Sequence, residues 1–279
     1  MAVILPAYLL LQHPLCKFDI VRVIIEQRKP FNSLDKGVVK PIFRPHKQCD
    51  YITTRNPVRY HNFNWFDPKV QELLKYLNEV FDSKQLINYI IQLLGYCMFG
   101  GNLQHIGIVF YGIGQNSKTV FVHLLEQLFK RYWEHIPTQN LCLNARFKFN
   151  QYHSIEPSTR IALVTDIDEK ININNLIMKN DVVPILVANN KIKFHKLNAQ
   201  STIGGQGLSS EKNFGSKIKL IVIPFESTFT RHLNGDKRQY LLNPYMFEKM
   251  QDLADSMLWL IVRKYNHKFD CYAEMPNRS

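Results

Sequence analysis

The chain has 279 residues, of which 46% are hydrophobic and 21% are charged, and its formal net charge is +12. These fractions are typical of a folded chain with a sizeable core and exclude a disordered or low-complexity one. The positive charge favours an anionic partner, nucleic acid before a membrane surface, and the alternative is a merely basic surface.

The five cysteines are scattered and form no C-x-x-C pair. This spacing supports neither a zinc site nor a disulfide framework, and it predicts a reducing, intracellular setting. The apolar start, residues 1–15, has no basic region before it, is interrupted by Pro6 and His13, and is shorter than the roughly 20 residues that span a bilayer. We therefore expect a buried segment there and no membrane partner.

Residues 1–66 mix short apolar runs with prolines, basic residues and aromatics. This pattern predicts no definite element, and we interpret it as an N-terminal segment compatible with the remnant of a preceding domain. The pattern is clearer from Asp67, which can cap a helix with Pro68 in its first turn. Apolar residues then repeat at helical spacing from Val70 to Val80.

A second helix is expected directly after the first. Asp82 or Ser83 can open it, further apolar residues give it a buried face, and Gly95 can end it. Two helices joined by a tight turn predict a small helical collar over residues 67–100.

The pattern then changes to alternating strands and helices. Ile106–Tyr111 predicts a buried strand, and Lys118–Tyr132 predicts a helix. Further strands are expected at Ile161–Thr165, Ile185–Ala188 and Lys219–Ile223. This alternation favours an α/β fold with a mainly parallel sheet that helices cover on both faces. We assign this core to residues 101–232.

A C-terminal helical segment is expected over residues 233–279, with its helix beginning near Asn243–Pro244. The side chains expected to be buried on that helix are Phe247, Met250, Leu253, Met257, Leu260 and Ile261.

The loop "GIGQNSKT" between the predicted strand and helix carries the most specific chemistry. A phosphate-binding loop reads G-x-x-x-x-G-K-[ST], and Gly112, Lys118 and Thr119 match it. Backbone N–H groups would face phosphate oxygens, Lys118 would reach the β- and γ-phosphates, and the Thr119 hydroxyl would bind magnesium. The predicted nucleotide-binding residues are Gly112, Ile113, Gly114, Gln115, Asn116, Ser117, Lys118 and Thr119. The alternative is a glycine turn followed by Lys-Thr by chance.

Ser117 stands where the template has glycine. Glycine there permits a backbone conformation that a β-carbon resists, at a cost of about 1–3 kcal/mol if the dihedrals are strained. We expect this residue to weaken nucleotide binding without abolishing it. Asn116 could orient an attacking water or contact the γ-phosphate.

Polar residues follow two of the other predicted strands. In "RIALVTDIDE" an apolar strand ends at Asp166, with Asp168 just beyond. A carboxylate at this position can hold magnesium and a second can polarise the attacking water. In "ILVANNKIKF" Asn189 or Asn190 ends a strand where an amide could sense the γ-phosphate, although asparagine is also a common turn former.

The ordered set of motifs resembles the superfamily III helicase domain of poxvirus-like primase–helicases of large DNA viruses and phages. The family loop reads G-x-G-x-N-G-K-[ST], close to "GIGQNSKT". "TDIDEKININNLIMK" is similar to the acidic motif, "NNKIKF" to the asparagine motif, favouring Asn189, and "KIKLIVIPFESTFT" to the arginine-bearing segment. The resemblance runs from about residue 50 to residue 265.

The resemblance implies a P-loop ring-ATPase core (AAA+-like) behind a helical collar. Such chains form a hexameric ring, use ATP and Mg²⁺, and translocate on single-stranded or duplex DNA to unwind it. Matched to the motifs, the catalytic residues would be Lys118, Asp166, Asp168, Asn189 and Lys219, with Thr119 and Asp166 holding the metal. The DNA-binding residues would be Lys191, Lys193 and Lys196. If the protein is viral, it would act at the site of viral DNA replication in the host cell.

Several residues depart from the family pattern. Ser117 replaces the loop glycine, and Ile192 stands where the asparagine motif has proline. The expected arginine is Lys219 (or Lys217), and lysine cannot reproduce the planar, two-pronged contact of guanidinium.

Three functions follow from these observations. The leading one is an ATP-dependent DNA helicase or replication ATPase. The alternative is a catalytically decayed paralogue that acts as a non-catalytic DNA-binding or assembly subunit; the departures favour it, while the retained Lys-Thr pair and the acidic cluster oppose it. A small-molecule phosphotransferase is weaker, because we find no arginine-rich lid segment and the net charge suits a polyanion better.

Overall fold

A computed structural model gives the arrangement of the chain, and it describes residues 9–11, 21–24, 42–45, 56–99, 106–112, 114–136, 158–165, 185–189, 219–265 and 276. Its helices are α1 (Pro68–Phe81), α2 (Lys84–Phe99), α3 (Lys118–Phe129), the 3-10 turn η2 (Lys130–Tyr132) and α5 (Met246–Lys264). The strands are β1 (Leu9–Leu11), β2 (Val21–Ile24), β3 (Ile42–Pro45), β4 (Ile106–Tyr111), β5 (Trp133–His135), β6 (Ile161–Thr165), β7 (Ile185–Asn189), β8 (Lys219–Pro224), β9 (Thr228–Thr230) and β10 (Gln239–Leu241).

The central sheet has five strands in the order β5-β6-β7-β4-β8, and all neighbours are parallel. This confirms the predicted α/β character and parallel sheet. The carboxyl ends of the strands therefore lie at one edge, where open α/β sheets bind their ligands. β1, β2 and β3 form a separate antiparallel sheet, and β9 pairs with β10 in a small parallel one.

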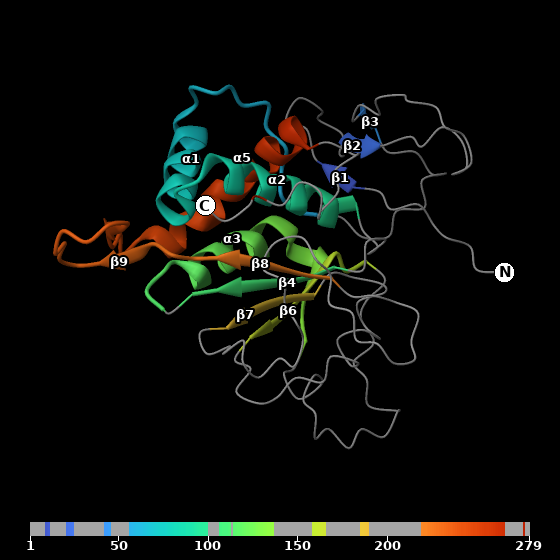
Figure 1. Cartoon of the computed structure of the whole chain (residues 1–279). Helices are drawn as coiled ribbons and strands as arrows, with labels where there is room; N and C mark the ends of the chain where they lie inside the picture. The colour runs from blue at the N-terminus through green and yellow to red at the C-terminus, as the bar shows by residue number, and fades with distance from the viewer. Residues whose placement is uncertain are drawn as a thin grey trace, which may run out of the picture.

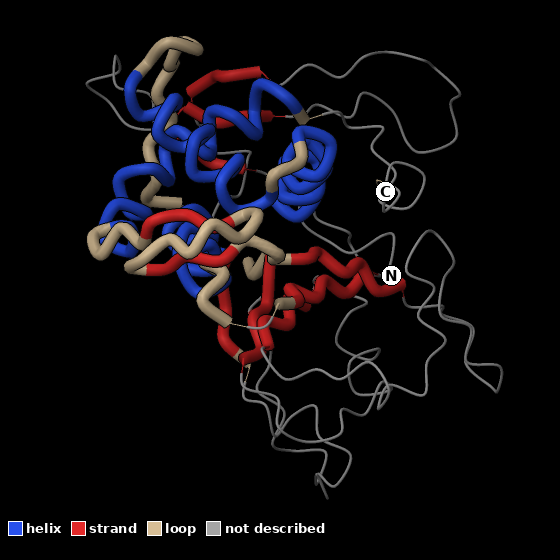
Figure 2. The backbone as a smooth tube through the Cα atoms, turned by 60° about the vertical axis from the view of Figure 1, so that its left-hand side comes forward, coloured by secondary structure: helices blue, strands red, loops and turns tan. Residues whose placement is uncertain are grey.

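The described helices all lie on one side of the central sheet (Figures 1 and 2). Helix α3 packs against α5, which in turn contacts both α1 and α2. We expected helices on both faces, and a helix on the other face is not among the described residues. No helix in the described part of the chain is both long enough and apolar enough to span a membrane.

The helical collar begins as predicted. The Asp67 carboxylate caps α1 by accepting a hydrogen bond from the Lys69 N–H at 3.1 Å. Asp82 ends this helix in the left-handed region, with φ 48°. Ser83 opens α2, because its hydroxyl accepts a hydrogen bond from the Leu86 N–H at 3.2 Å.

Gly95 does not end the second helix, which continues to Phe99. A β-carbon at Gly95 would overlap the ring of Tyr265, the residue directly after α5. The glycine is therefore explained by the close approach of two helices and not by a turn.

The last helix begins at Met246, close to the predicted start, and it buries Met250, Leu253, Met257, Leu260 and Ile261 as predicted. The expectation for Phe247 is wrong, since its side chain is 44% exposed. Phe247 lies in the first turn, before the buried part of the helix that begins at Met250, and it stacks on the His123 ring instead.

An aromatic cluster joins the collar to the sheet. It consists of Phe81 of α1, Phe110 of β4, Phe121 of α3 and Phe225, just after β8. Phe121 and Phe225 each contact the other three rings, with centroids 5.0–5.8 Å apart. All four side chains are buried. Aromatic pairs at this spacing add to the energy of area burial, so the collar and the sheet share one hydrophobic core.

Gly95→Ala is expected to lower the free energy of unfolding. Alanine improves helix propensity by about 1 kcal/mol, but overpacking against Tyr265 costs about 1–3 kcal/mol. In a Tyr265→Ala background the overlap is absent, so the same change should stabilise the protein. Denaturant unfolding of the four variants would measure both effects, and a stabilised Gly95→Ala single variant would contradict the packing explanation.

Candidate functional site

The predicted phosphate-binding loop connects the end of β4 to the start of α3, at the carboxyl edge of the sheet. A β-carbon at Gly112 would collide with the Asn116 amide and would lie 2.5 Å from the Phe225 carbonyl oxygen. Gly114 has φ 102°, a conformation that glycine adopts without strain. Both early glycines are therefore required by the shape of the loop.

The Lys118 ammonium is buried inside this loop. The residue is 4% exposed, and its Nζ donates hydrogen bonds to the Gly112 carbonyl oxygen at 2.6 Å and to Asn116 Oδ1 at 3.2 Å. Both partners are neutral, and among the described residues it forms no ion pair with a carboxylate. Burial lowers the pKa of Lys118 from its ordinary value. An anion bound here would supply the missing negative charge.

Asn116 holds the loop against the end of β8. It is 4% exposed, its Oδ1 accepts from Lys118, and its Nδ2 donates to the Phe225 carbonyl oxygen at 3.2 Å. The sequence suggested a contact with water or the γ-phosphate, and in this structure the amide is engaged within the loop.

Ser117 adopts the backbone conformation for which glycine is suited. Its φ of 65° and ψ of 12° are left-handed, and its side chain makes no capping hydrogen bond to α3. Its Oγ instead lies 3.2 Å from the hydroxyl of Tyr76, a side chain of α1 that is 1% exposed. Burial raises the pKa of Tyr76, and the hydrogen bond with Ser117 acts in the opposite direction. The collar therefore contacts the loop at the residue that departs from the template.

The tip of the loop is tied to β9. The Phe229 N–H donates to the Gln115 carbonyl oxygen at 2.7 Å. At the base of the loop, the Phe225 N–H donates to the Tyr111 carbonyl oxygen at 2.7 Å. The segment after β8 thus passes along the loop and is fixed to it at two points.

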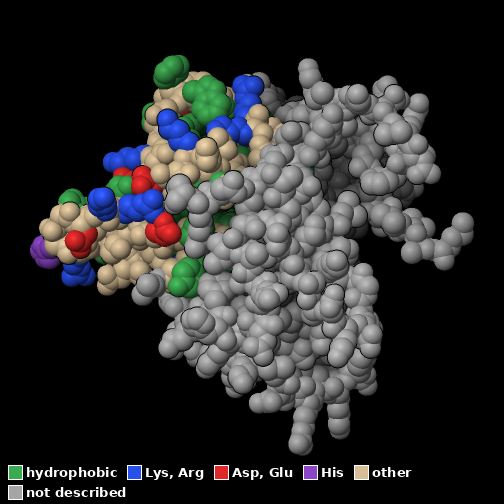
Figure 3. Space-filling view, in the orientation of Figure 1, with side chains coloured by type: hydrophobic (Ala, Val, Ile, Leu, Met, Phe, Trp, Pro, Cys, Tyr) green, Lys and Arg blue, Asp and Glu red, His purple; other side chains and the backbone are tan. Residues whose placement is uncertain are grey.

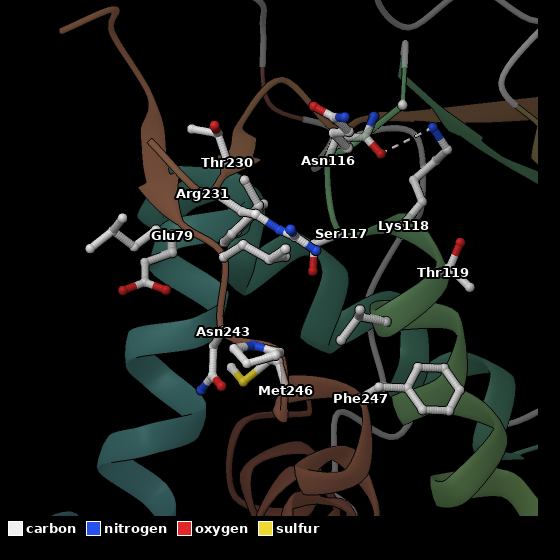
Figure 4. A pocket seen from close by; sticks show the side chains of 17 residues that line it. Glu79, Asn116, Ser117, Lys118, Thr119, Thr230, Arg231, Asn243, Met246 and Phe247 are labelled. Carbon is white, nitrogen blue, oxygen red and sulfur yellow. Dashed lines mark hydrogen bonds between the residues drawn. The ribbon is translucent and has the colours of Figure 1, made fainter. Parts of the chain in front are cut away.

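A cavity of about 670 Å³ opens beside the loop (Figure 4). Its walls come from the loop and the start of α3, from α1, from β9 and the turn after it, and from the segment that leads into α5. The lining residues include Glu79 of α1, Ser117 and Lys118 of the loop, Thr119, Arg231 and Phe247. This volume lies within the usual range for small-molecule sites of about 300–1,000 Å³.

One side of the cavity is apolar. Leu241, Leu242 and Pro244 line it together with Met246 and Phe247. The Phe247 ring stacks on His123 with centroids 3.9 Å apart and an interplanar angle of 10°. Exposed apolar and aromatic groups next to a phosphate-type loop form a surface on which a flat, hydrophobic group can pack.

The strand register brings Asn189 next to the loop. Asn189 is the last residue of β7 and pairs with Tyr111, directly before Gly112. Thr165, which ends β6 directly before Asp166 in the sequence, pairs with Ala188. The predicted site residues Ile113, Asp166, Asp168, Lys191, Lys193 and Lys196 lie outside the described residues.

Lys219 lies at the end of the sheet opposite the loop, where the strands have their amino ends. It starts β8 and pairs with Ile106, whereas Pro224 at the other end of β8 pairs with Tyr111 beside the loop. Five steps along a strand correspond to about 16 Å. The backbone placement therefore separates Lys219 from the loop of its own chain.

The exposed Thr119 is the second residue of α3. No group of three or more metal-binding side chains occurs among the residues that the structure describes. The predicted metal pair of Thr119 and Asp166 includes one residue outside the described part, and it remains a prediction.

Four residues of the site were not recognised from sequence: Tyr76, Phe225, Arg231 and, as a lining residue, Phe247. Tyr76 and Phe247 occupy apolar positions at helical spacing, which predicts burial and gives no sign of contact with a loop far away in sequence. Arg231 follows directly after "STFT" without any recognisable motif.

The described surface is mixed in charge. In the view of Figure 3, Lys and Arg side chains lie beside acidic ones instead of forming an unbroken basic face. Arg238 pairs with Asp82 and Glu226, and Lys249 pairs with Glu72. A continuous basic surface for nucleic acid is therefore not present on this face of the described region.

No family model and no curated protein matches this chain. Solved apo structures of the C-terminal region of NrS-1 are similar at low identity. One is 13% identical, with a TM-score of 0.47, over 75% of this chain and 49% of that one. Another is 16% identical, with a TM-score of 0.42, over 88% of this chain and 53% of that one. The chain spans about half the length of these structures, and similarity at this level assigns neither an activity nor a partner.

Ser117→Gly should be more stable than Ser117→Ala by about 1 kcal/mol. Both changes remove the hydroxyl that contacts Tyr76, but only glycine relieves the left-handed backbone. Thr119, in the regular first turn of α3, provides the matched control. There the alanine variant should be more stable than the glycine variant by about 1 kcal/mol, because alanine has the higher helix propensity. Thermal or denaturant unfolding would measure the stabilities of these variants. If Ser117→Ala were at least as stable as Ser117→Gly, the backbone at position 117 would not be strained.

Proposed function

We propose that this chain is an ATP-dependent DNA helicase or replication ATPase that hydrolyses ATP to translocate on and unwind DNA. The observation that carries the proposal is the buried ammonium of Lys118, whose partners among the described residues are neutral. It lies at the start of a helix, at the end of a parallel sheet where the strands have their carboxyl ends. A helix N-terminus and a desolvated cation together favour a bound phosphate.

The cavity supports a whole nucleotide as the ligand. Its polar end is formed by the loop and Thr119, and its apolar end by the segment leading into α5. The polar end suits the phosphates of ATP, and the apolar end beside Phe247 suits the base. Magnesium, held by Thr119 and Asp166, would neutralise charge on the phosphate oxygens.

We assign the groups that hydrolysis requires to the strand ends beside the loop. Asn189 ends the strand next to the loop strand, and β6 ends one residue before Asp166. In the proposed reaction Asp168 accepts a proton from the attacking water, whose oxygen bonds to the γ-phosphorus while the bond to the β–γ bridging oxygen breaks. ADP and phosphate are the products, and Asn189 contacts the γ-phosphate.

Translocation on DNA is supported by the net charge of +12 and by the resemblance of the ordered motifs to superfamily III helicases. We assign the DNA contacts to Lys191, Lys193 and Lys196 and the active assembly to a hexameric ring. In that ring Lys219, remote from its own loop, would act on the nucleotide of a neighbouring subunit. The alternative is a decayed paralogue that binds DNA without hydrolysing ATP, and it is favoured by the left-handed φ of Ser117.

Magnesium-dependent ATP hydrolysis by the purified chain, with and without single-stranded DNA, tests the proposal. We expect DNA-stimulated turnover that falls about 100-fold or more in Lys118→Ala, because the phosphates lose their buried cation. Lys84→Ala, an exposed lysine at the start of α2, is the matched control and should leave turnover unchanged.

Ser117→Gly distinguishes the ATP-hydrolysing helicase from the decayed paralogue. Faster turnover in this variant than in the wild-type chain would identify a working motor slowed by the serine, and turnover only in the variant would identify a single broken position. No turnover in either chain, with DNA still bound, would reject the enzyme and establish the decayed paralogue.

A further inference from the structure

We propose that Arg231 is a phosphate-binding residue that contacts the bound nucleotide in its own chain, from the side of the cavity opposite α3. The inference rests on the proposed nucleotide function and adds to it a cation that no motif in the sequence identifies. It concerns a residue in the turn after β9 that lines the same cavity as the loop.

First, the Arg231 side chain points into the cavity. Figure 4 shows Arg231 directed into the cavity toward Ser117, with Lys118 and Thr119 on the far side. A phosphate chain lying along the loop would therefore have Lys118 on one side and the Arg231 guanidinium on the other. Guanidinium presents a planar fork of N–H donors that matches phosphate oxygens.

Second, the described residues leave this guanidinium available for a ligand. Within the part of the chain that the structure describes, Arg231 makes neither an ion pair nor a side-chain hydrogen bond. The neighbouring Arg238 shows the contrast, since Asp82 and Glu226 both pair with it. Arg238 thus links the β9–β10 region to the end of α1, whereas the guanidinium of Arg231 faces the cavity.

Third, the backbone that carries Arg231 is fixed relative to the loop. Phe229, two residues earlier, donates its N–H to the Gln115 carbonyl oxygen at 2.7 Å. The Thr230 hydroxyl donates to the His232 carbonyl oxygen at 3.0 Å and accepts from the His232 N–H at 3.2 Å. These bonds close the turn around Arg231. The backbone is therefore already ordered, and phosphate binding costs little further conformational entropy there.

This placement of Arg231 also bears on the arginine that the helicase pattern expects and this sequence lacks. The expected arginine is a lysine at position 219, and β8 carries that residue to the other edge of the sheet. Arg231 supplies a guanidinium to the loop from within the same chain. The inferred ligand is the phosphate chain of a nucleoside di- or triphosphate, with a weaker contribution to a monophosphate.

Calorimetric binding of ATP, ADP and AMP to the full chain tests the inference. Arg231→Ala should weaken ATP binding about tenfold or more and leave AMP binding nearly unchanged, because charge-assisted hydrogen bonds to phosphate are lost. Arg231→Lys should recover part of the loss, since it keeps the charge but not the fork. Arg131→Ala is the matched control, because this exposed arginine follows the far end of α3.

The outcomes separate this inference from the proposed function. Wild-type binding that needs Lys118 but is unchanged in Arg231→Ala would overturn the role of Arg231 and leave the nucleotide site standing. Equal weakening of ATP and AMP would also overturn it, because the contact would then not be to the phosphate chain. If the wild-type chain binds no nucleotide, the proposed function fails first and this inference fails with it.

Discussion

The site depends on one buried charge, the ammonium of Lys118. Within the part of the chain that the structure describes, the partners of this ammonium are the Gly112 carbonyl oxygen and the Asn116 amide oxygen. The loop can adopt this geometry because Gly112 has no side chain that would collide with the Asn116 amide. The Nδ2 of that amide donates a hydrogen bond to the Phe225 carbonyl oxygen, which holds it in place. A buried ammonium costs free energy unless it is paired, so this arrangement is more favourable with an anion than without one.

The collar is part of the same structural unit as the loop. The aromatic cluster of Phe81, Phe110, Phe121 and Phe225 packs α1 against the sheet, and Tyr76 contacts Ser117 directly. A change in loop conformation must therefore alter a buried contact with α1. Buried cores are close-packed and transmit such displacements, which gives the loop a physical connection to the collar.

The sequence predicted β4, β6, β7 and β8 because buried parallel strands read as short continuous apolar runs. The three-residue strands β5, β9 and β10 carry too few residues for a periodic signal. The loop, Lys118 and the position of Asn189 were likewise predictable, because a local motif and strand ends define them. Tyr76 and Arg231 were not, because their roles depend on contacts between segments far apart in sequence.

The strain at Ser117 bears on whether the loop is a relic. A left-handed serine costs about 1–2 kcal/mol, and a buried lysine with no carboxylate partner among the described residues adds a second unfavourable contribution. A loop that served only as a connection could remove both costs with glycine at position 117 and an apolar residue at 118. The chain instead keeps both, and it surrounds the lysine with a cavity, a helix N-terminus and a cation on the opposite wall. Costly local structure of this kind is typical of binding sites, which accords with the proposed binding of phosphate at this loop.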